Sequence, residues 1–181
     1  MRRVMNYYLI GFPCCGKTTV GRELSRLTGL AFVDLDEHIE RSQGLSIGEL
    51  MARLGQERFR QLECAALRLL AQRGGTIVAC GGGTPCQPGM MQLMNATGIT
   101  VWLTTSEQRL IARLCLPEHR SKRPLISALS DDQIAAWVHT TIMQRAPHYA
   151  HAQLQFDATD IETAAETTAT TRRLAQTLRL L

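Results

Sequence analysis

The sequence predicts an α/β protein in which helices cover both faces of a parallel sheet. Short apolar stretches alternate along the chain with segments of helical periodicity, and this order requires crossover connections between parallel strands. A glycine-rich stretch follows the first apolar stretch, and acids and further glycines follow the next two. Ligands of such sheets bind beyond the carboxyl ends of the strands, so these three segments predict one shared site.

Five apolar or β-branched stretches are expected to be strands, at residues 5–10, 30–34, 76–80, 99–103 and 154–157. Helices are expected at residues 17–29, 35–43, 46–53, 56–73, 106–114, 131–146 and 160–179. Gly44 and Gly55 are expected to interrupt the helical pattern, and Pro147 is expected to end or kink the helix before it. Residues 115–126 are expected to form a polar loop.

Length and composition fit a single globular domain over residues 1–181. Apolar residues make up 45% of the chain and charged residues 20%, the usual balance of a soluble protein. The net charge of +4 is too small to indicate a nucleic-acid-binding protein. Apolar runs are too short to span a membrane, and the first residues fit a buried strand better than a signal peptide. Six cysteines without metal-site spacing indicate reduced thiols and a cytoplasmic protein.

The clearest functional motif is GFPCCGKT at residues 11–18, which has the G-x-x-x-x-G-K-[ST] pattern of a phosphate-binding loop. Backbone N–H groups of such a loop surround a phosphate, helped by the positive end of the following helix. Gly11 and Gly16 allow backbone angles and close approaches that a Cβ atom would obstruct. Lys17 is therefore expected on the β- and γ-phosphates of ATP, and the Thr18 hydroxyl on Mg²⁺.

Cys14 and Cys15 occupy free positions of this motif. Neighbouring cysteines rarely bind one metal ion, and the chain has no partner ligands at suitable spacing. A helix N-terminus can modify the pKa of a thiol, so sensitivity of this loop to oxidation is a hypothesis.

Residues after the second and third strands predict an acceptor site. Asp34 and Asp36 alternate at a strand end, so one can support Mg²⁺ through water while the other accepts a hydrogen bond from an attacking hydroxyl. An acidic helix N-terminus explains the two acids equally well. Residues 81–83 are three glycines, which suggest a close approach of the backbone to a ligand, with a flexible turn as the alternative.

Three arginines could add positive charge to this site. Arg60 and Glu63 share a helix face, which a surface ion pair would also explain. Arg145 could bind a carboxylate with its planar fork, or it could only complement the end of its helix. Arg123 lies in a basic loop that could close over the phosphates or remain a solvated loop.

Taken in order, these segments resemble the shikimate kinase family over nearly the whole chain. The resemblance is carried by GFPCCGKTTVGRELS, FVDLDEHIE, GLSIGEL, ERFRQLE, IVACGGGT, VWL, RPLI and QRAPHY. It implies a three-layer α/β/α P-loop kinase fold whose central parallel sheet has five strands in the order 2-3-1-4-5. It also implies transfer of the ATP γ-phosphate to the 3-hydroxyl of shikimate, in the pathway to chorismate and the aromatic amino acids.

The resemblance implies roles for individual residues on the nucleotide side. The metal ion would be held by Thr18 and, through water, by Asp34. Arg113 would flank the adenine, whose other side would face residues 156–160, and the lid arginine would be Arg123. Contacts to ATP would come from Gly11, Pro13, Cys14, Cys15, Gly16, Lys17, Thr18, Thr19, Arg113 and Arg123.

On the acceptor side, the resemblance assigns Asp36 to the shikimate hydroxyls, with Lys17, Asp36 and Arg123 as the catalytic residues. Arg60, held by Glu63, and Arg145 would grip the carboxylate. The wall of the ring site would be formed by Gly81, Gly82 and Gly83. The substrate-binding helical region would cover residues 34–63 and the lid residues 113–126.

The sequence departs from the family pattern in two places. The two cysteines replace small residues, usually including glycine, in the phosphate loop. The lid differs in length and content, so Arg120, Lys122 and Arg123 could share its role; Arg123 is favoured because RPLI, at residues 123–126, follows the family pattern there.

Two other functions fit part of the sequence. A gluconate-type kinase would share Lys17 and Thr18 but would not need Arg60 and Arg145 together with the triple glycine. A nucleotide-binding regulator without catalysis usually lacks the acid or a gripping arginine, and this chain has both. The expected partner is shikimate, with no nucleic acid or membrane, and the protein is expected to be a monomer.

Overall fold

A computed structural model describes residues 5–121, 123 and 125–181. Five parallel strands form one sheet in the order β2-β3-β1-β4-β5. This arrangement confirms the predicted fold. The strands are β1 (Asn6–Ile10), β2 (Ala31–Asp34), β3 (Thr76–Ala79), β4 (Gly98–Thr104) and β5 (Leu154–Asp157).

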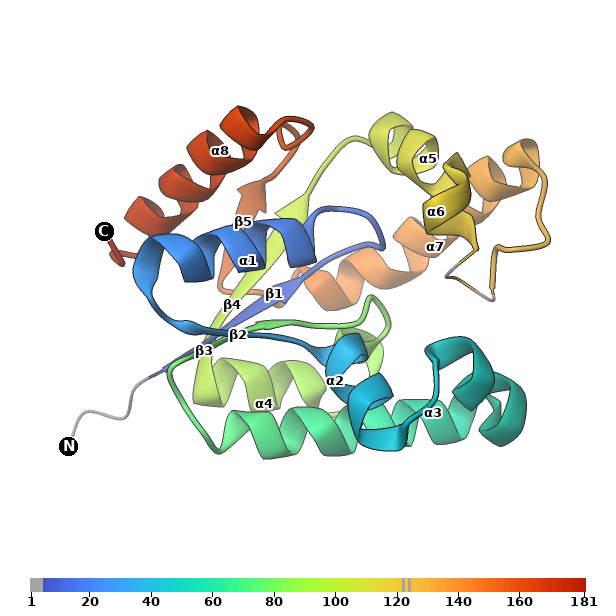
Figure 1. Cartoon of the computed structure of the whole chain (residues 1–181), viewed down its shortest axis with the longest axis horizontal. Helices are drawn as coiled ribbons and strands as arrows, with labels where there is room; N and C mark the ends of the chain where they lie inside the picture. Colours follow the sequence, from blue (N-terminus) through green and yellow to red (C-terminus); the bar gives the residue numbers. More distant parts are fainter. Residues whose placement is uncertain (1–4, 122, 124) are drawn as a thin grey trace.

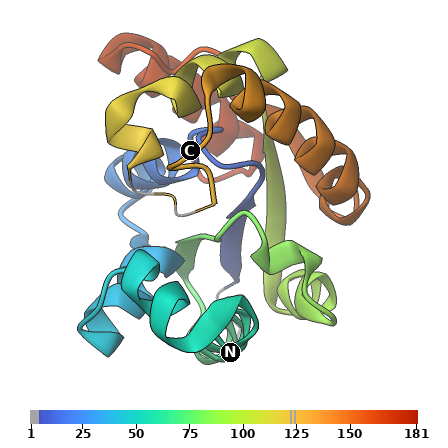
Figure 2. The ribbon, with the colours of Figure 1, turned by 90° about the vertical axis from the view of Figure 1, so that its right-hand side faces the viewer.

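Helices cover both faces of the sheet (Figure 1). On one face lie α1 and α8, and on the other lie α3 and α4. Seen toward the carboxyl ends of the strands, α2 and the start of α3 lie opposite α5, α6 and α7 (Figure 2). The helices are α1 (Lys17–Thr28), α2 (Leu35–Gln43), α3 (Ile47–Ala71), α4 (Met90–Thr97), α5 (Glu107–Cys115), α6 (Pro117–Arg120), α7 (Asp131–Tyr149) and α8 (Ala164–Thr177).

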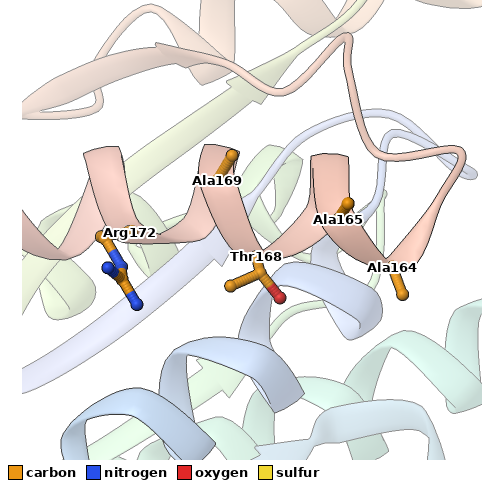
Figure 3. Close-up of a pocket in the computed structure, with 5 residues that line it drawn as sticks. All are labelled: Ala164, Ala165, Thr168, Ala169 and Arg172. Carbon is orange, nitrogen blue, oxygen red and sulfur yellow. The ribbon is translucent and has the colours of Figure 1, made fainter.

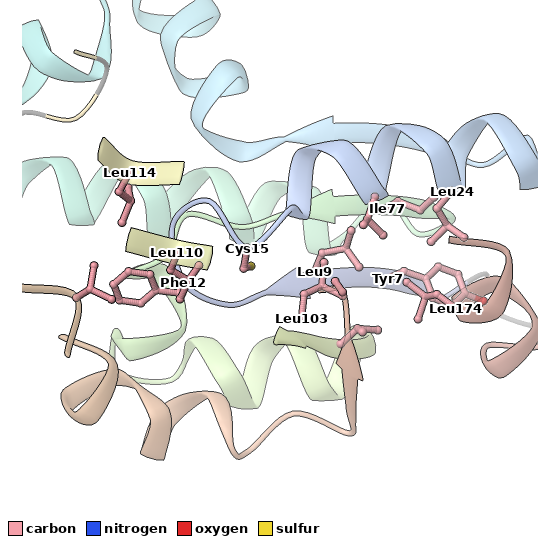
Figure 4. Close-up of a cluster of buried hydrophobic side chains, with 14 of the residues drawn as sticks. Tyr7, Leu9, Phe12, Cys15, Leu24, Ile77, Leu103, Leu110, Leu114 and Leu174 are labelled. Atoms are coloured by element: carbon pink, nitrogen blue, oxygen red, sulfur yellow. The ribbon is translucent and has the colours of Figure 1, made fainter. Parts of the chain in front are cut away.

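The central strand β1 is buried on both faces. Its successive side chains point to opposite sides of the sheet, and each side is covered by a hydrophobic cluster. Tyr7 and Leu9 belong to the hydrophobic cluster beneath α1 and α8, which also contains Leu24 and Leu174 (Figure 4). Tyr8 and Ile10 belong to a second cluster that includes side chains of α3 and α4. The sheet is therefore fixed between two hydrophobic layers.

Helices α4, α6 and α8 differ from the sequence-based expectation. Residues 90–97 form α4, which was not predicted, and the polar loop contains the short helix α6. The last helix begins at Ala164 rather than at residue 160, because Thr163 and Glu166 form a capping box at its start.

Two expected interruptions of helices have different outcomes. Gly55 has φ 79° and kinks α3 where a break was predicted. Pro147 was predicted to end or kink its helix after residue 146, but α7 continues to Tyr149. Proline has no N–H group to donate to the carbonyl oxygen of Met143, and Met143 is an exposed residue of this helix. Within the described ranges, no helix is both long and apolar enough to cross a membrane.

Two leucines of α3 test the packing of this helix. Leu67 is fully buried, whereas Leu69 is 59% exposed. We expect Leu67→Ala to lower the free energy of unfolding by about 2–5 kcal/mol, because it removes apolar contacts and leaves a cavity. The matched variant Leu69→Ala should change that free energy by less than about 0.5 kcal/mol. Urea unfolding measures both values, and equal losses would contradict the described packing.

Candidate active site

The site lies where three neighbouring strands end. Asp34 pairs with Ala79 across the β2–β3 ladder, and Ala79 pairs with Leu9 across the β3–β1 ladder. The loops that follow these positions therefore leave the sheet side by side. They are the phosphate loop (residues 11–16), the start of α2, and the glycine loop (residues 81–83).

Glycine is required at both ends of the phosphate loop. Gly11 has φ 141° and Gly16 has φ 99°. A Cβ atom on Gly11 would lie 2.6 Å from the carbonyl oxygen of Leu103, and one on Gly16 would clash with the side chain of Ile161. Gly16 directly precedes α1, so the helix begins at the loop and its positive end would face an anion bound there.

The Lys17 ammonium folds back over the phosphate loop. Its Nζ atom donates hydrogen bonds to the carbonyl oxygens of Gly11, at 3.0 Å, and Phe12, at 2.8 Å. These backbone acceptors fix the charge beside the loop. The geometry is suited to binding a phosphate, because the ammonium and the loop amides are positive groups on one small surface.

The two cysteines have different environments. Cys15 is 1% exposed and packs in the hydrophobic cluster beneath the loop (Figure 4). Cys14 is partly exposed and has a positive φ of 63°, a backbone region that costs a residue other than glycine about 1–2 kcal/mol. Burial raises the pKa of the Cys14 thiol, and the charges of Arg123 and Lys17 oppose this shift. Sensitivity of the loop to oxidation stays a prediction.

Thr18 and Asp34 bring two oxygen ligands together at the start of α1. The Thr18 hydroxyl donates to Asp34 Oδ2 over 2.6 Å. The other oxygen of Asp34 caps α2 by accepting from the backbone N–H groups of Asp36 and Glu37. Hydroxyl and carboxylate oxygens suit Mg²⁺, which keeps several waters and takes few protein ligands. Nowhere in the described chain do three acidic, histidine or cysteine side chains gather around one point.

A buried ion pair supports the acceptor side of the site. Glu63 is 1% exposed and forms a close ion pair with Arg60. Its other oxygen accepts a 2.8 Å hydrogen bond from the Thr84 hydroxyl. The pair is therefore not a surface ion pair. Sequence reasoning did not find Thr84, and only its position directly after the three glycines could have indicated it.

The glycine loop brings these side chains close together. A Cβ atom on Gly81 would lie 3.1 Å from Asp36 Oδ1 and would clash with Glu63, and one on Gly83 would lie 2.8 Å from Arg60. Burial raises the pKa of Asp36 to about 7, and the negative charges of Glu63 and Asp34 act in the same direction. The charges of Lys17 and Arg60 oppose this shift. Asp36 is therefore poised to exchange a proton near neutral pH.

Arg145 lies on the other side of the glycine loop. A Cβ atom on Gly82 would lie 3.1 Å from an Arg145 guanidinium nitrogen and 3.0 Å from Pro13. The Arg145 guanidinium lies over the ring of Phe12, 5.9 Å from its centroid. The Tyr149 hydroxyl donates to the Gly82 carbonyl oxygen over 2.6 Å. Sequence reasoning missed Tyr149, although it lies four residues beyond Arg145 and so on the same helix face.

Two more arginines approach the phosphate loop from the α5 side. Arg113 donates to the carbonyl oxygen of Cys14 over 2.9 Å. The charge of Arg123 acts on the Cys14 thiol, and its guanidinium donates to the His119 carbonyl oxygen. Arg120 instead pairs with Asp131, and Lys122 lies outside the described residues. The structure thus brings Arg113 into contact with the loop, whereas Arg123 acts on it through its charge and Arg120 is paired with Asp131.

A separate hollow of about 570 Å³ lies on the surface of α8, away from the strand ends (Figure 3). It is lined by Ala164, Ala165, Thr168, Ala169 and Arg172. These side chains belong to one helix, and they include no carboxylate, imidazole or thiol. The chemistry of this chain is therefore assigned to the strand ends.

Comparisons with known proteins agree with this geometry. The shikimate kinase family model matches residues 13–178. The shikimate kinase of Parabacteroides distasonis is 38% identical over 158 residues, which cover 87% of this chain and 88% of that protein.

Solved structures extend the likeness to the fold. The shikimate kinase of Bacteroides thetaiotaomicron has a TM-score of 0.91 at 32% identity, over 97% of this chain and 98% of that chain. The shikimate kinase of Acinetobacter baumannii, solved in complex with shikimate, has a TM-score of 0.82 at 29% identity, over 97% and 94% of the two chains. The chain therefore belongs to the shikimate kinase family, whose members phosphorylate shikimate with ATP.

Proposed function

We propose that this chain transfers the γ-phosphate of ATP to the 3-hydroxyl of shikimate, with Mg²⁺ bound to the nucleotide. The observation that carries the proposal is the arrangement at one sheet edge. A phosphate loop with its lysine lies beside Asp36, and Arg60 and Arg145 flank the glycine loop. The family match and the shikimate complex of the related A. baumannii enzyme support this acceptor.

On the nucleotide side, the phosphate-loop amides and Lys17 hold the β- and γ-phosphates. Further contacts to ATP come from the same part of the backbone, at Pro13, Cys14, Cys15 and Thr19. Thr18 and, through water, Asp34 would hold Mg²⁺, which would neutralise charge on the phosphates. Arg123 reaches the phosphates from the lid.

The adenine would lie between Arg113 and residues 156–160. This placement is supported by the position of Arg113, whose guanidinium contacts both the phosphate loop and Glu162, just beyond that segment. The planar guanidinium offers a face on which an aromatic base can stack.

On the acceptor side, Arg60 and Arg145 bind the shikimate carboxylate, and the glycine loop lets the ring approach the backbone. Asp36 accepts a hydrogen bond from the 3-hydroxyl. As the bond between the 3-oxygen and the γ-phosphorus forms, the bond from that phosphorus to the β–γ bridging oxygen breaks, and ADP leaves. The hydroxyl proton passes to Asp36, and positioning and charge contribute most of the acceleration.

We propose that residues 1–181 act as one domain, in which residues 34–63 bind shikimate and residues 113–126 form the lid. The charge of Arg123, which lowers the pKa of the Cys14 thiol in the phosphate loop, supports this division. The predicted monomeric state and cytoplasmic location belong to the same proposal, as does the reduced state of the six free cysteines.

The function is tested by incubating the purified protein with MgATP and either shikimate or gluconate. We expect ADP release and shikimate 3-phosphate with shikimate, and neither with gluconate. Coupled spectrophotometry and mass spectrometry follow the two products. Transfer to gluconate alone would favour the gluconate-type kinase, and nucleotide binding without transfer would favour the regulator.

The variant Arg145→Ala tests the carboxylate site. We expect a loss of about 2–5 kcal/mol in transition-state binding, seen mainly as a higher KM for shikimate, because the buried carboxylate loses a paired guanidinium. The KM for ATP should stay within about twofold of the wild-type value. Arg172→Ala, on the exposed side of α8, is the matched control. An unchanged KM for shikimate in Arg145→Ala would show that another arginine binds the carboxylate.

The pH profile tests the role of Asp36. Its pKa is raised to about 7, so below that pH the carboxyl is protonated and cannot accept the hydroxyl proton. At saturating MgATP, we expect kcat/KM for shikimate to rise about tenfold per pH unit up to about pH 7 and then to level off. Asp36→Asn should be slow and should lose this rising limb. A wild-type profile already level at about pH 5 would contradict the assignment.

A further inference from the structure

Cys14 is an unusual residue for its place in the phosphate loop. Apart from Arg179, it is the one residue other than glycine with positive φ in the described part of the chain. The left-handed region crowds the Cβ atom against the following carbonyl oxygen, so glycine is the residue that adopts it without strain. A bend that cysteine does not favour must be stabilised by contacts from elsewhere in the structure.

The backbone N–H group of Cys15 closes the turn locally by donating to the Phe12 carbonyl oxygen over 3.2 Å. A further contact that stabilises this bend comes from α5. The Nη1 atom of Arg113 donates to the carbonyl oxygen of Cys14 over 2.9 Å. The Arg113 side chain is 12% exposed, so this hydrogen bond is largely shielded from water. It joins the phosphate loop to a residue 99 positions away in the sequence. The orientation of the Cys14 peptide therefore depends on where Arg113 is held.

Arg113 is itself held by Glu162. A single oxygen of Glu162 accepts from Arg113 Nη2 at 2.6 Å and from Arg113 Nε at 3.1 Å, and it also accepts from Arg109 at 3.1 Å. The backbone of Glu162 is fixed because its N–H group donates to Glu166, which closes the capping box of α8. Glu162 thus connects the start of α8 to the phosphate loop through one guanidinium.

We propose that Glu162 is a positioning residue for nucleotide binding, which acts through Arg113 to hold the phosphate loop in its left-handed bend at Cys14. The inference rests on the nucleotide-binding part of the proposed function. Glu162 is half-exposed, so its ion pair alone would add little to global stability. Glu162 instead raises the fraction of molecules whose phosphate-loop amides point toward a bound phosphate. When that fraction falls, the affinity for nucleotide falls in proportion.

The test is the dissociation constant of MgADP, measured by calorimetry without shikimate. Glu162→Ala should weaken MgADP binding about tenfold, a factor that matches the strain of one left-handed residue. In the double variant Cys14→Gly/Glu162→Ala, affinity should return to within about twofold of Cys14→Gly alone, because glycine adopts the bend unaided. In Cys14→Ala/Glu162→Ala it should stay weak, because alanine is strained like cysteine.

The matched control is Glu23→Ala, which breaks the Arg26–Glu23 ion pair and a hydrogen bond to Thr168 of α8 but leaves MgADP affinity unchanged. Equal weakening in the glycine and alanine double variants would overturn the proposal, since Glu162 would then act independently of the bend. Unchanged affinity in Glu162→Ala would also overturn it. The binding measurement contains no shikimate, so its result does not depend on turnover. A chain that failed to phosphorylate shikimate would contradict the proposed function without changing the MgADP result.

Discussion

Three loops can share one site in this protein only because their strands are neighbours that run in the same direction. The order β2-β3-β1 places Asp34, the glycine loop and the phosphate loop beyond adjacent carboxyl ends. A different strand order would leave each segment intact and separate them by a strand width or more. The two hydrophobic layers on the sheet maintain this order, so core packing and the relative placement of donor and acceptor groups depend on the same constraint.

The acceptor side of the site is organised around a buried negative charge. Glu63 is nearly inaccessible to water, and a buried carboxylate is costly unless it is paired and hydrogen-bonded. Arg60 and Thr84 meet that requirement. The same charge lies close enough to Asp36 to disfavour its ionisation. One residue thus fixes an arginine that can bind a carboxylate and helps to raise the pKa of an acid that can accept a proton.

The sequence predicts those structural features well that are determined by the local amino-acid pattern. The five strands and the phosphate loop follow from apolar runs and from a motif with little freedom. Helix α4 was missed because it is short, apolar and flanked by glycines, and the end of α7 was misplaced because the helix passes Pro147. Roles set by tertiary contact were harder to predict. Thr84 and Tyr149 end the segments IVACGGGT and QRAPHY, and Glu162 lies in no motif, but the partner of each is distant in the sequence.

The phosphate loop shows how one bend can be stabilised in two physical ways. With glycine at residue 14, the bend would follow from local backbone freedom and would need no partner. With cysteine, it depends on Arg113 and hence on α5 and the start of α8. Linkage is reciprocal, so a nucleotide that favours the bent loop must equally favour the Arg113–Glu162 contact. Replacing glycine by cysteine in this loop therefore couples phosphate binding to the elements that would enclose the adenine, a coupling that the motif alone does not contain.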